Sequence, residues 1–315
     1  MTFPVSFDNI QKAHELIRPY VHRTPILTSE SVNQIAGCEL YFKCENFQKI
    51  GAFKARGGVN AVMSLPEEAR KNGVLTHSSG NHAQAIALAA KMAGVPAYIV
   101  MPKTAPEVKQ KAVAGYGAHI TLCEPTQQSR EETAARIQEE TGATFISPYN
   151  DYAVITGQAT CAKELLEDQE QLDIVIAPVG GGGLLAGTAL TCHYMNPTIA
   201  VYAGEPEGAQ DTFLSMKNGE MTKVDNPSSI ADGLLASMGE KNFGIIQPLV
   251  KDILVVTDAE IVEAMRLIWE RMKIIIEPSC AVPVAAILKY RAPFQGKKVG
   301  VILTGGNVDL AKLPF

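Results

Sequence analysis

Four short segments of the sequence carry residue types that could act chemically on a small charged molecule. They hold a lysine among small and apolar neighbours, a Ser-Ser-Gly-Asn-His run, four consecutive glycines and a Thr-Gly-Gly-Asn run: Lys54, 78–82, 180–183 and 304–307. A lysine that is partly out of water has its ammonium form disfavoured, which makes it a better nucleophile toward a carbonyl. Consecutive glycine N–H groups at the start of a helix can converge on an anion.

The tetraglycine Gly180 to Gly183 lies between an expected buried strand and an expected helix. It lacks the Gly-Lys-Ser/Thr ending of a P-loop and the spacing of a dinucleotide fingerprint. A tight strand-to-helix turn is the alternative, but four glycines cost more backbone entropy than a turn requires, which favours a phosphate site. A phosphate site combined with the carbonyl-reactive Lys54 predicts an aldehyde-bearing phosphate cofactor, for which pyridoxal phosphate is the candidate.

The other two segments also follow expected strands. Ser78 to His82 offers hydroxyls and N–H donors at a helix start, which suits a substrate carboxylate or an ordinary N-cap equally well. Thr304 follows the last expected strand, so its hydroxyl would reach the carboxyl end of a parallel sheet, where ligands bind. Simple strand termination is the alternative there.

The elements that must position these segments alternate between strands and helices. Strands are predicted at 39–44, 74–76, 97–101, 118–123, 174–179, 199–203, 253–256 and 299–303. Helices are predicted at 53–65, 81–93, 106–114, 129–141, 152–166, 184–194, 258–272 (capped by Asp258) and 280–290. This alternation predicts an α/β fold with parallel sheets covered by helices. One complete series predicts a small domain, 72–148, inserted into a large cofactor-binding domain, 1–71 and 149–315.

Length and composition agree with a chain of about two domains. The sequence has 315 residues, 46% of them hydrophobic, and a net charge of −5, so no overall basic field would attract nucleic acid. The stretch 174–204 contains no charged residue, but its prolines and glycines favour a buried β-α-β unit over a membrane span. The N-terminus lacks the pattern of a secretory signal, so we expect a cytoplasmic protein. The six scattered cysteines are expected to be reduced and buried.

The four segments, in this order, resemble the motifs of the fold-type II pyridoxal phosphate enzymes, and within them serine racemase and its serine, threonine and 3-hydroxyaspartate dehydratase relatives. The resemblance covers essentially the whole chain. It implies a tryptophan-synthase-β-like fold of two parallel-sheet domains with the active site between them. A non-catalytic phosphate-binding protein that kept the fold is the alternative from another class, and the presence of Lys54, Ser79 and Asn81 together argues against it.

The resemblance also implies a role for each site residue. Lys54 would bind the cofactor aldehyde and remove the α-proton, and Ser79 would act as acid or base on the opposite face. Phe53 would pack on the cofactor ring, Asn81 would bond the ring hydroxyl, and the run Gly180, Gly181, Gly182, Gly183 and Leu184 would hold the phosphate. Thr304, where the family usually has serine, would contact the pyridine nitrogen as a neutral hydroxyl.

Further positions are matched to substrate, metal and nucleotide. The substrate would be bound by Ser78, Ser79, Gly80, Asn81, His82, Arg130 and Tyr149. A divalent cation, Mg²⁺ or else Ca²⁺ or Mn²⁺, would be bound by Glu205, Asp211 and the carbonyl of Ala209, since hard cations prefer oxygen ligands. An activating nucleotide, ATP, would be bound by Lys49, Gln84, Lys109, Tyr116 and Asn307.

These matches imply an enzyme acting on small β-hydroxy amino acids, a racemase of serine that also dehydrates serine or threonine to a 2-oxo acid and ammonia. A threo-3-hydroxyaspartate ammonia-lyase is the alternative within the family, because Tyr149 stands where animal serine racemases have asparagine. Relatives imply a homodimer.

Overall fold

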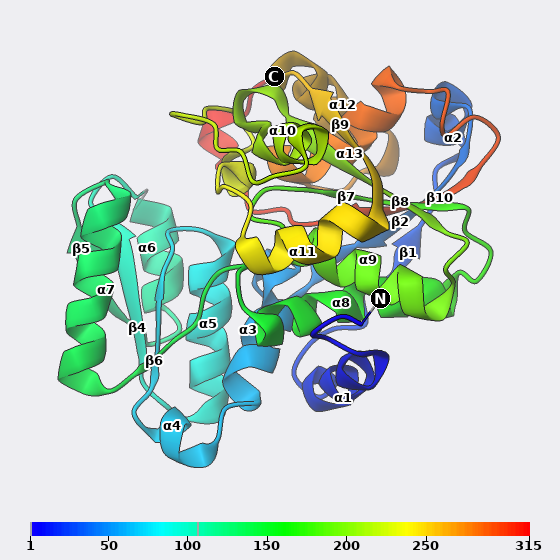
Figure 1. The fold of residues 1–315 in the computed structure, drawn as a ribbon. Coiled ribbons are helices and arrows are strands. Elements are labelled where there is room, and N and C mark those ends of the chain that lie inside the picture. Colours follow the sequence, from blue (N-terminus) through cyan, green and yellow to red (C-terminus); the bar gives the residue numbers. More distant parts are fainter. Residues whose placement is uncertain (1, 106) are drawn as a thin grey trace.

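Two mainly parallel sheets organise the chain in a computed structural model, which describes residues 2–105 and 107–315. The smaller sheet with its helices lies to the left in Figure 1 and the larger one to the right. The predicted α/β class with two parallel-sheet units is confirmed.

The larger sheet has the strand order β1-β2-β10-β7-β8-β9, and only β1 runs antiparallel to its neighbour. Its strands are β1 (Ile26–Leu27), β2 (Glu39–Cys44), β7 (Ile174–Pro178), β8 (Ala200–Pro206), β9 (Val250–Val256) and β10 (Lys298–Leu303). The last strand along the chain, β10, lies between β2 and β7, with Val301 paired to Phe42 on one side and to Ile176 on the other. The sheet therefore joins both ends of the sequence.

The smaller sheet has the order β5-β4-β3-β6 and is entirely parallel. Its strands are β3 (Val74–His77), β4 (Ala97–Pro102), β5 (His119–Cys123) and β6 (Thr144–Phe145). All four fall between residues 72 and 148, the limits predicted for the small domain. The domain limits themselves remain a prediction.

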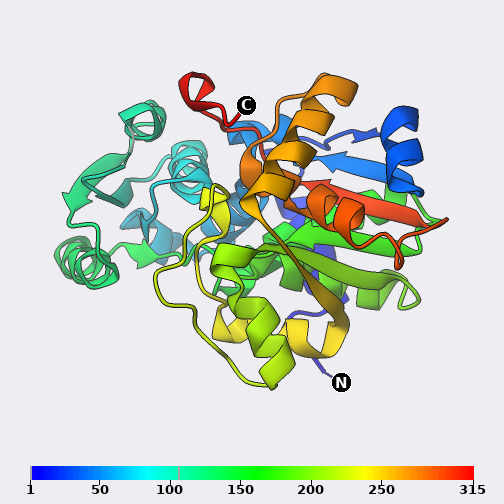
Figure 2. The ribbon, with the colours of Figure 1, turned by 90° about the horizontal axis from the view of Figure 1, so that it is seen from above.

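Helices cover both faces of each sheet (Figure 2). They are α1 (Phe7–Ile17), α2 (Glu30–Ala36), α3 (Lys54–Met63), α4 (Glu67–Lys71), α5 (Asn81–Ala93), α6 (Glu107–Ala114), α7 (Gln127–Thr141), α8 (Tyr152–Asp168), α9 (Gly183–Met195), α10 (Asp211–Asn218), α11 (Glu240–Leu249), α12 (Asp258–Met272) and α13 (Pro278–Lys289). Short 3₁₀ turns are η1 (Glu45–Phe47), η2 (Lys49–Gly51), η3 (Glu207–Ala209), η4 (Asp232–Leu234) and η5 (Leu310–Lys312). Helices α2, α12 and α13 pack on one face of the larger sheet, and α1, α8, α9 and α11 lie on the other side.

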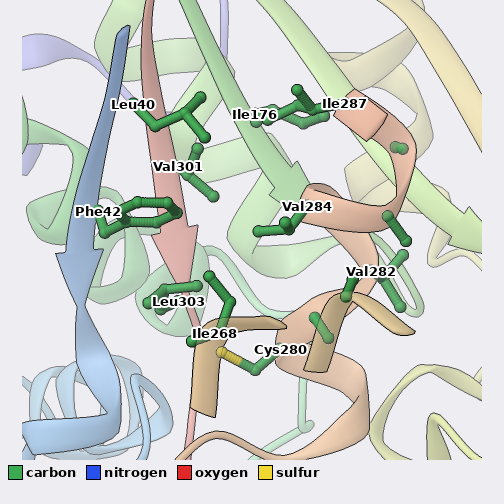
Figure 3. Close-up of a cluster of buried hydrophobic side chains, with 14 of the residues drawn as sticks. Leu40, Phe42, Ile176, Ile268, Cys280, Val282, Val284, Ile287, Val301 and Leu303 are labelled. Carbon is green, nitrogen blue, oxygen red and sulfur yellow. The ribbon is translucent and has the colours of Figure 1, made fainter. Parts of the chain in front are cut away.

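Buried aliphatic side chains fix α13 and α12 against the larger sheet (Figure 3). Leu40, Phe42 and Val301 from adjacent strands meet Val284 and Ile287 of α13 in one continuous cluster. All five side chains are fully buried. Removing such surface from water contributes about 25 cal/mol per Å², so this layer holds the strand ends in fixed positions.

The predicted strands and helices are largely confirmed, with a few differences. Thr257, rather than Asp258, caps α12, because its hydroxyl accepts from the Glu260 amide and Glu260 returns a bond in a capping box. The helix predicted at 106–114 begins at Glu107 in the described chain, and Pro106 lies outside the described residues. Five helices within the described residues were not predicted: α1, α2, α4, α10 and α11. Three of them, α2, α4 and α10, have eight residues or fewer, and α11 contains Gly244 and Pro248.

The uncharged stretch 174–204 forms β7, α9 and most of β8, as predicted. No helix within the described residues combines the length and apolar character needed to cross a membrane. The six cysteines are buried and have free thiols, which confirms the prediction made for them.

Candidate active site

The predicted site segments all follow the carboxyl ends of parallel strands. The segment leading to Lys54 follows β2, Ser78 follows β3, the glycine loop 180–183 follows β7, and Thr304 follows β10. Ligands of parallel sheets bind at these strand ends. The contacts between the segments show which of them meet.

Lys54 is the first residue of α3, and its surroundings disfavour the charged amine. Its Nζ donates to the carbonyl of Pro148 at 2.7 Å and lies 5.3 Å from the centre of the Phe53 ring. Burial lowers the pKa of Lys54 from 10.5 to about 8. The backbone N–H of Phe53 donates to the carbonyl of Thr304 at 2.9 Å, so α3 begins against the end of β10. These contacts place the residue before Lys54 against Thr304.

The glycine loop is packed so closely against neighbouring residues that side chains on its glycines would clash with them. Gly182 has φ of +93° and is the N-cap of α9, and it supplies no side-chain acceptor to the first-turn N–H groups. The first turn of a helix leaves such N–H groups without partners, so they remain available to an anion. A Cβ on Gly181 would lie 2.3 Å from Cγ of Tyr149, the residue after Pro148. Tyr149 thus links the glycine loop to the Lys54 contact, and Leu184 in the first turn of α9 is buried.

Thr304 is 3% exposed, and its Oγ1 has no hydrogen-bond partner among the described residues. A buried hydroxyl without a partner costs free energy unless another group occupies that position. A ring nitrogen would satisfy it. The first-turn N–H groups of α9, the amine of Lys54 and this hydroxyl together fit pyridoxal phosphate.

The segment 78–82 connects β3 to α5. Ser78 accepts at Oγ from the amide of Gly80 at 3.3 Å, and Ser79 is half-buried. Asn81 begins α5, and its Oδ1 accepts from Asn307 Nδ2 at 2.8 Å. His82 is buried, with Nε2 3.4 Å from the carbonyl of Ile146. Burial and the charge of Lys54 hold the pKa of His82 well below its ordinary value, so its imidazole is neutral.

Sequence reasoning missed Glu277, which contacts both the segment after β3 of the smaller sheet and the segment after β10 of the larger sheet. Its Oε1 accepts from Asn81 Nδ2 at 3.0 Å, and its N–H donates to Gly305, the residue after Thr304, at 3.0 Å. Burial, with the charge of Asp232, raises the pKa of Glu277 to about 7. The available signal was a single carboxylate before Pro278 in a stretch otherwise rich in apolar residues.

Arg130 and Tyr149 approach the site from different elements. Arg130 is on the first turn of α7, and its buried Nε has no hydrogen-bond partner in the described chain. Burial, together with the positive charge of Arg130, lowers the pKa of His77, which directly precedes Ser78. The charge of Arg130 therefore acts on the residue that directly precedes the 78–82 segment. Burial raises the pKa of the Tyr149 hydroxyl.

The three predicted metal ligands lie together at the start of α10. Glu205 is fully buried, and its carboxylate accepts from the amides of Thr212 at 2.9 Å and Phe213 at 2.8 Å. Asp211 Oδ2 accepts from the amide of Met238 at 2.7 Å. Burial, with the charge of Asp211, raises the pKa of Glu205 to about 8.

Two buried carboxylates beside each other fit a divalent cation, because the cation would remove their mutual repulsion. Over residues 2–105 and 107–315, no group of three or more Asp, Glu, His or Cys side chains converges on one point. A cation here would therefore need a backbone carbonyl such as that of Ala209, which is buried in η3.

The five residues predicted to bind a nucleotide do not all contact one another in the structure. Asn307 Nδ2 donates to the carbonyl of Ile50, the residue after Lys49, at 2.7 Å. Gln84 belongs to α5, which packs against η2. Lys109 instead donates to Asp232 at 2.7 Å in an ion pair between the smaller sheet's helix α6 and η4. Tyr116 follows α6 and packs on the core of the smaller unit.

Comparison with known proteins shows which family and which characterised proteins the chain is similar to. The family model described as "Pyridoxal-phosphate dependent enzyme" matches residues 17–305. The chain is 51% identical over 310 residues to a protein named beta-hydroxyaspartate dehydratase from Paracoccus denitrificans (strain Pd 1222), covering 98% of each. It is 49% identical over 313 residues to serine racemase of Dictyostelium discoideum, covering 98% of this chain and 97% of that protein. The structure of maize serine racemase matches with a TM-score of 0.96 and 44% identity, covering 98% of this chain and 95% of that one.

Proposed function

The chain belongs to the pyridoxal-phosphate dependent enzymes, and from that premise we propose that it racemises serine and removes water from serine, threonine and related β-hydroxy amino acids. The observation that carries the proposal is Lys54. Its amine, with a pKa lowered to about 8, lies at the same strand ends as the first-turn N–H groups of α9 and the hydroxyl of Thr304. The serine racemases and the dehydratase among its relatives support the substrate class.

When bound, pyridoxal phosphate supplies an electron sink for the electron pair left when the α-proton leaves an amino acid. Lys54 Nζ holds and releases that proton on one face, because burial lets the amine exist in its neutral form near pH 8. The first-turn N–H groups of α9 would hold the phosphate, and Thr304 would contact the ring as a neutral hydroxyl. Such a neutral partner would stabilise negative charge on the ring less than a charged one, which would favour loss of a β-substituent.

The two reactions differ in what happens after the proton reaches Lys54. If Ser79 delivers a proton to the opposite face of the α-carbon, the amino acid is released with inverted configuration. If the bond from Cβ to its hydroxyl breaks instead, the leaving hydroxide takes up one proton, which balances the α-proton removed by Lys54, and departs as water. The unsaturated amino acid that is released, aminoacrylate from serine, then takes up one water and splits into a 2-oxo acid and ammonia. Serine therefore yields pyruvate and ammonia overall.

The proposal is tested by borohydride reduction followed by peptide mapping and by a chiral product assay. Reduction should attach a pyridoxyl label to Lys54, and L-serine should give both D-serine and pyruvate. Lys54→Ala should lose the label and both activities. A label on another lysine, or neither product from L-serine in protein carrying the cofactor, would refute the proposed function.

A specific observation also favours 3-hydroxyaspartate as a substrate. Arg130 has a buried Nε without a partner in the described chain, and a guanidinium pairs well with a second carboxylate. A hydrogen bond to a charged group contributes about 1.5–3 kcal/mol, or about 10- to 100-fold. Arg130→Gln should therefore lower kcat/KM for 3-hydroxyaspartate by that factor and spare L-serine. Equal losses on the two substrates would exclude this role.

We further propose that Glu205, Asp211 and the carbonyl of Ala209 bind Mg²⁺, or else Ca²⁺ or Mn²⁺. The bound cation would stabilise the fold around the site. The two buried carboxylates support this. ATP is proposed as an activator at Lys49, Gln84, Lys109, Tyr116 and Asn307, and it would compete with Asp232 for Lys109. Activity measured with and without magnesium and ATP tests both.

We also propose that the protein is a cytoplasmic homodimer. Exposed apolar side chains support the dimer: Phe47 and Ile275 are 46% and 48% exposed, and Asn46 donates to the carbonyl of Ile275, which brings them together. Light scattering of purified protein tests the oligomeric state.

A further inference from the structure

Helix α3, which begins with Lys54, is packed between the two sheet units. A Cβ on Gly57 would lie 2.2 Å from Nε2 of Gln158 on α8, and one on Gly58 would lie 2.8 Å from Cβ of Ala85 on α5. The backbones of α3 and its neighbours therefore touch almost directly. Helix α8 belongs to the larger unit and α5 to the smaller one, so α3 is shared by both.

Two residues after Lys54, Arg56 forms a fully buried cluster of charges. Its Nε and Nη2 donate to the two carboxylate oxygens of Glu45 at 2.8 Å each. Its Nη1 and Nη2 donate to the two oxygens of Glu164 at 2.8 and 2.7 Å. Lys43 Nζ donates to Glu164 at 2.8 Å, and Thr24 donates to Glu45 at 2.5 Å. Two cations thus balance two anions, with Arg56, Lys43 and Glu45 at 0% exposure and Glu164 at 2%.

Every anchor of this cluster belongs to the larger unit. Glu45 directly follows β2, Lys43 is within β2, and Glu164 is on α8. The first turn of α3 meets the end of β10 as well, through the bond from Phe53 to Thr304. By contrast, α3 meets the described residues of the smaller unit through apolar packing without directional bonds: Gly58 lies against Ala85, and Val59 joins a buried apolar cluster with Ile86 of α5.

We propose that Arg56 is a positioning residue, which fixes the first turn of α3 to the larger unit so that Lys54 keeps its place relative to the glycine loop and Thr304. A planar guanidinium bonded to two carboxylates fixes orientation, which a single ammonium or an apolar side chain cannot do. Buried ion pairs add little net stability over apolar residues of the same volume, so the geometry is their distinctive contribution. The inference rests on the proposed role of Lys54 as the cofactor-binding lysine.

Arg56→Lys tests the inference, because it keeps the charge and loses the fork of donors. A misplacement of about 1 Å can cost about 100-fold in rate. We expect kcat for L-serine to fall by about that factor with KM nearly unchanged. A readout independent of turnover is amide hydrogen exchange of the apoprotein, which should accelerate in the first turn of α3 while α8 and α9 stay protected.

The matched control is Arg23→Gln. Arg23 also joins the N-terminal part of the chain to α8, through Glu167 and Asp168, but it is half-exposed and forms no hydrogen bond with the described residues of α3. This control should keep the wild-type kcat and exchange pattern. If Arg56→Lys fails to fold, Glu164→Gln serves instead, since it leaves the pair with Glu45 intact, and it should lower kcat by about tenfold.

Wild-type kcat and wild-type exchange of α3 in a folded variant would overturn the inference. A uniform rise in exchange across the whole protein would also overturn it, because that would indicate loss of stability without a local effect on α3. The borohydride label separates this outcome from failure of the proposed function. A label on Lys54 with wild-type turnover in Arg56→Lys refutes only the positioning role, whereas a label elsewhere in the wild-type protein refutes the role of Lys54.

Discussion

Lys54 should destabilise the protein when the cofactor is absent, and this can be measured. Burial lowers the pKa of Lys54 from 10.5 to about 8. One pKa unit corresponds to 1.36 kcal/mol, so this shift lowers the free energy of unfolding of the apoprotein by about 3 kcal/mol at neutral pH, where the amine is protonated in both folded and unfolded states. Lys54→Met removes the charge and keeps most of the volume, but it leaves the carbonyl of Pro148 without its donor, which costs about 1 kcal/mol. We therefore expect Lys54→Met apoprotein to be about 2 kcal/mol more stable at pH 7.

The sign of the pH dependence follows from the lowered pKa. Between pH 8 and 10.5 the unfolded chain binds a proton at Lys54 that the folded chain does not, so the stability of the wild-type apoprotein rises with pH in this range. The advantage of Lys54→Met should thus shrink to nearly zero by pH 10. Urea unfolding of both apoproteins at pH 7 and pH 10 measures it. Equal stability at pH 7, or a gap that persists unchanged to pH 10, would refute the reasoning.

Three further changes give distinct outcomes. Ser79→Ala should abolish conversion of L-serine to D-serine while keeping much of the pyruvate formation in a chiral assay, and equal loss of both would show that Ser79 does not act on one face. Gly181→Ala places a Cβ 2.3 Å from the Tyr149 ring, which should lower the free energy of unfolding by about 1–3 kcal/mol. It should also weaken pyridoxal phosphate binding at least tenfold in a fluorescence titration. Gly244→Ala, which has open space around its Cβ, should do neither. Mg²⁺ at 100 times its Kd should stabilise the wild-type protein by about 2.7 kcal/mol in urea unfolding and leave Glu205→Gln unchanged; equal stabilisation of both would place the ion elsewhere.

Local features of the site could be predicted from the sequence, and its long-range contacts could not. Lys54 at a helix start and the glycine loop after a strand depend on neighbouring residues, so their types and spacing were sufficient. The partner of Lys54 is Pro148, 94 positions away, and Asn81 meets Glu277 across 196 positions. Such pairs depend on how the two sheets are placed, which no local pattern encodes.

The same limit applies to the charged cluster around Arg56. A buried arginine has the same sequence signature as an exposed one at the start of a helix, because the charges that balance it lie at distant positions. Glu164 is 108 positions from Arg56, inside a helix whose buried face also holds Lys163. Its burial became evident only when β2, α3 and α8 were seen together.

The central place of β10 sets the order in which the protein can assemble. All strands of the smaller sheet are contiguous in sequence, so that unit can fold while the rest of the chain is still being synthesised. In the larger sheet β2 must wait for β10, since Leu40 pairs with Val299 about 260 positions later. Closing a loop of that length before any pairing is gained makes this step slow. Because Thr304 follows β10 directly, a nascent chain cannot complete its cofactor site until nearly the whole sequence has emerged.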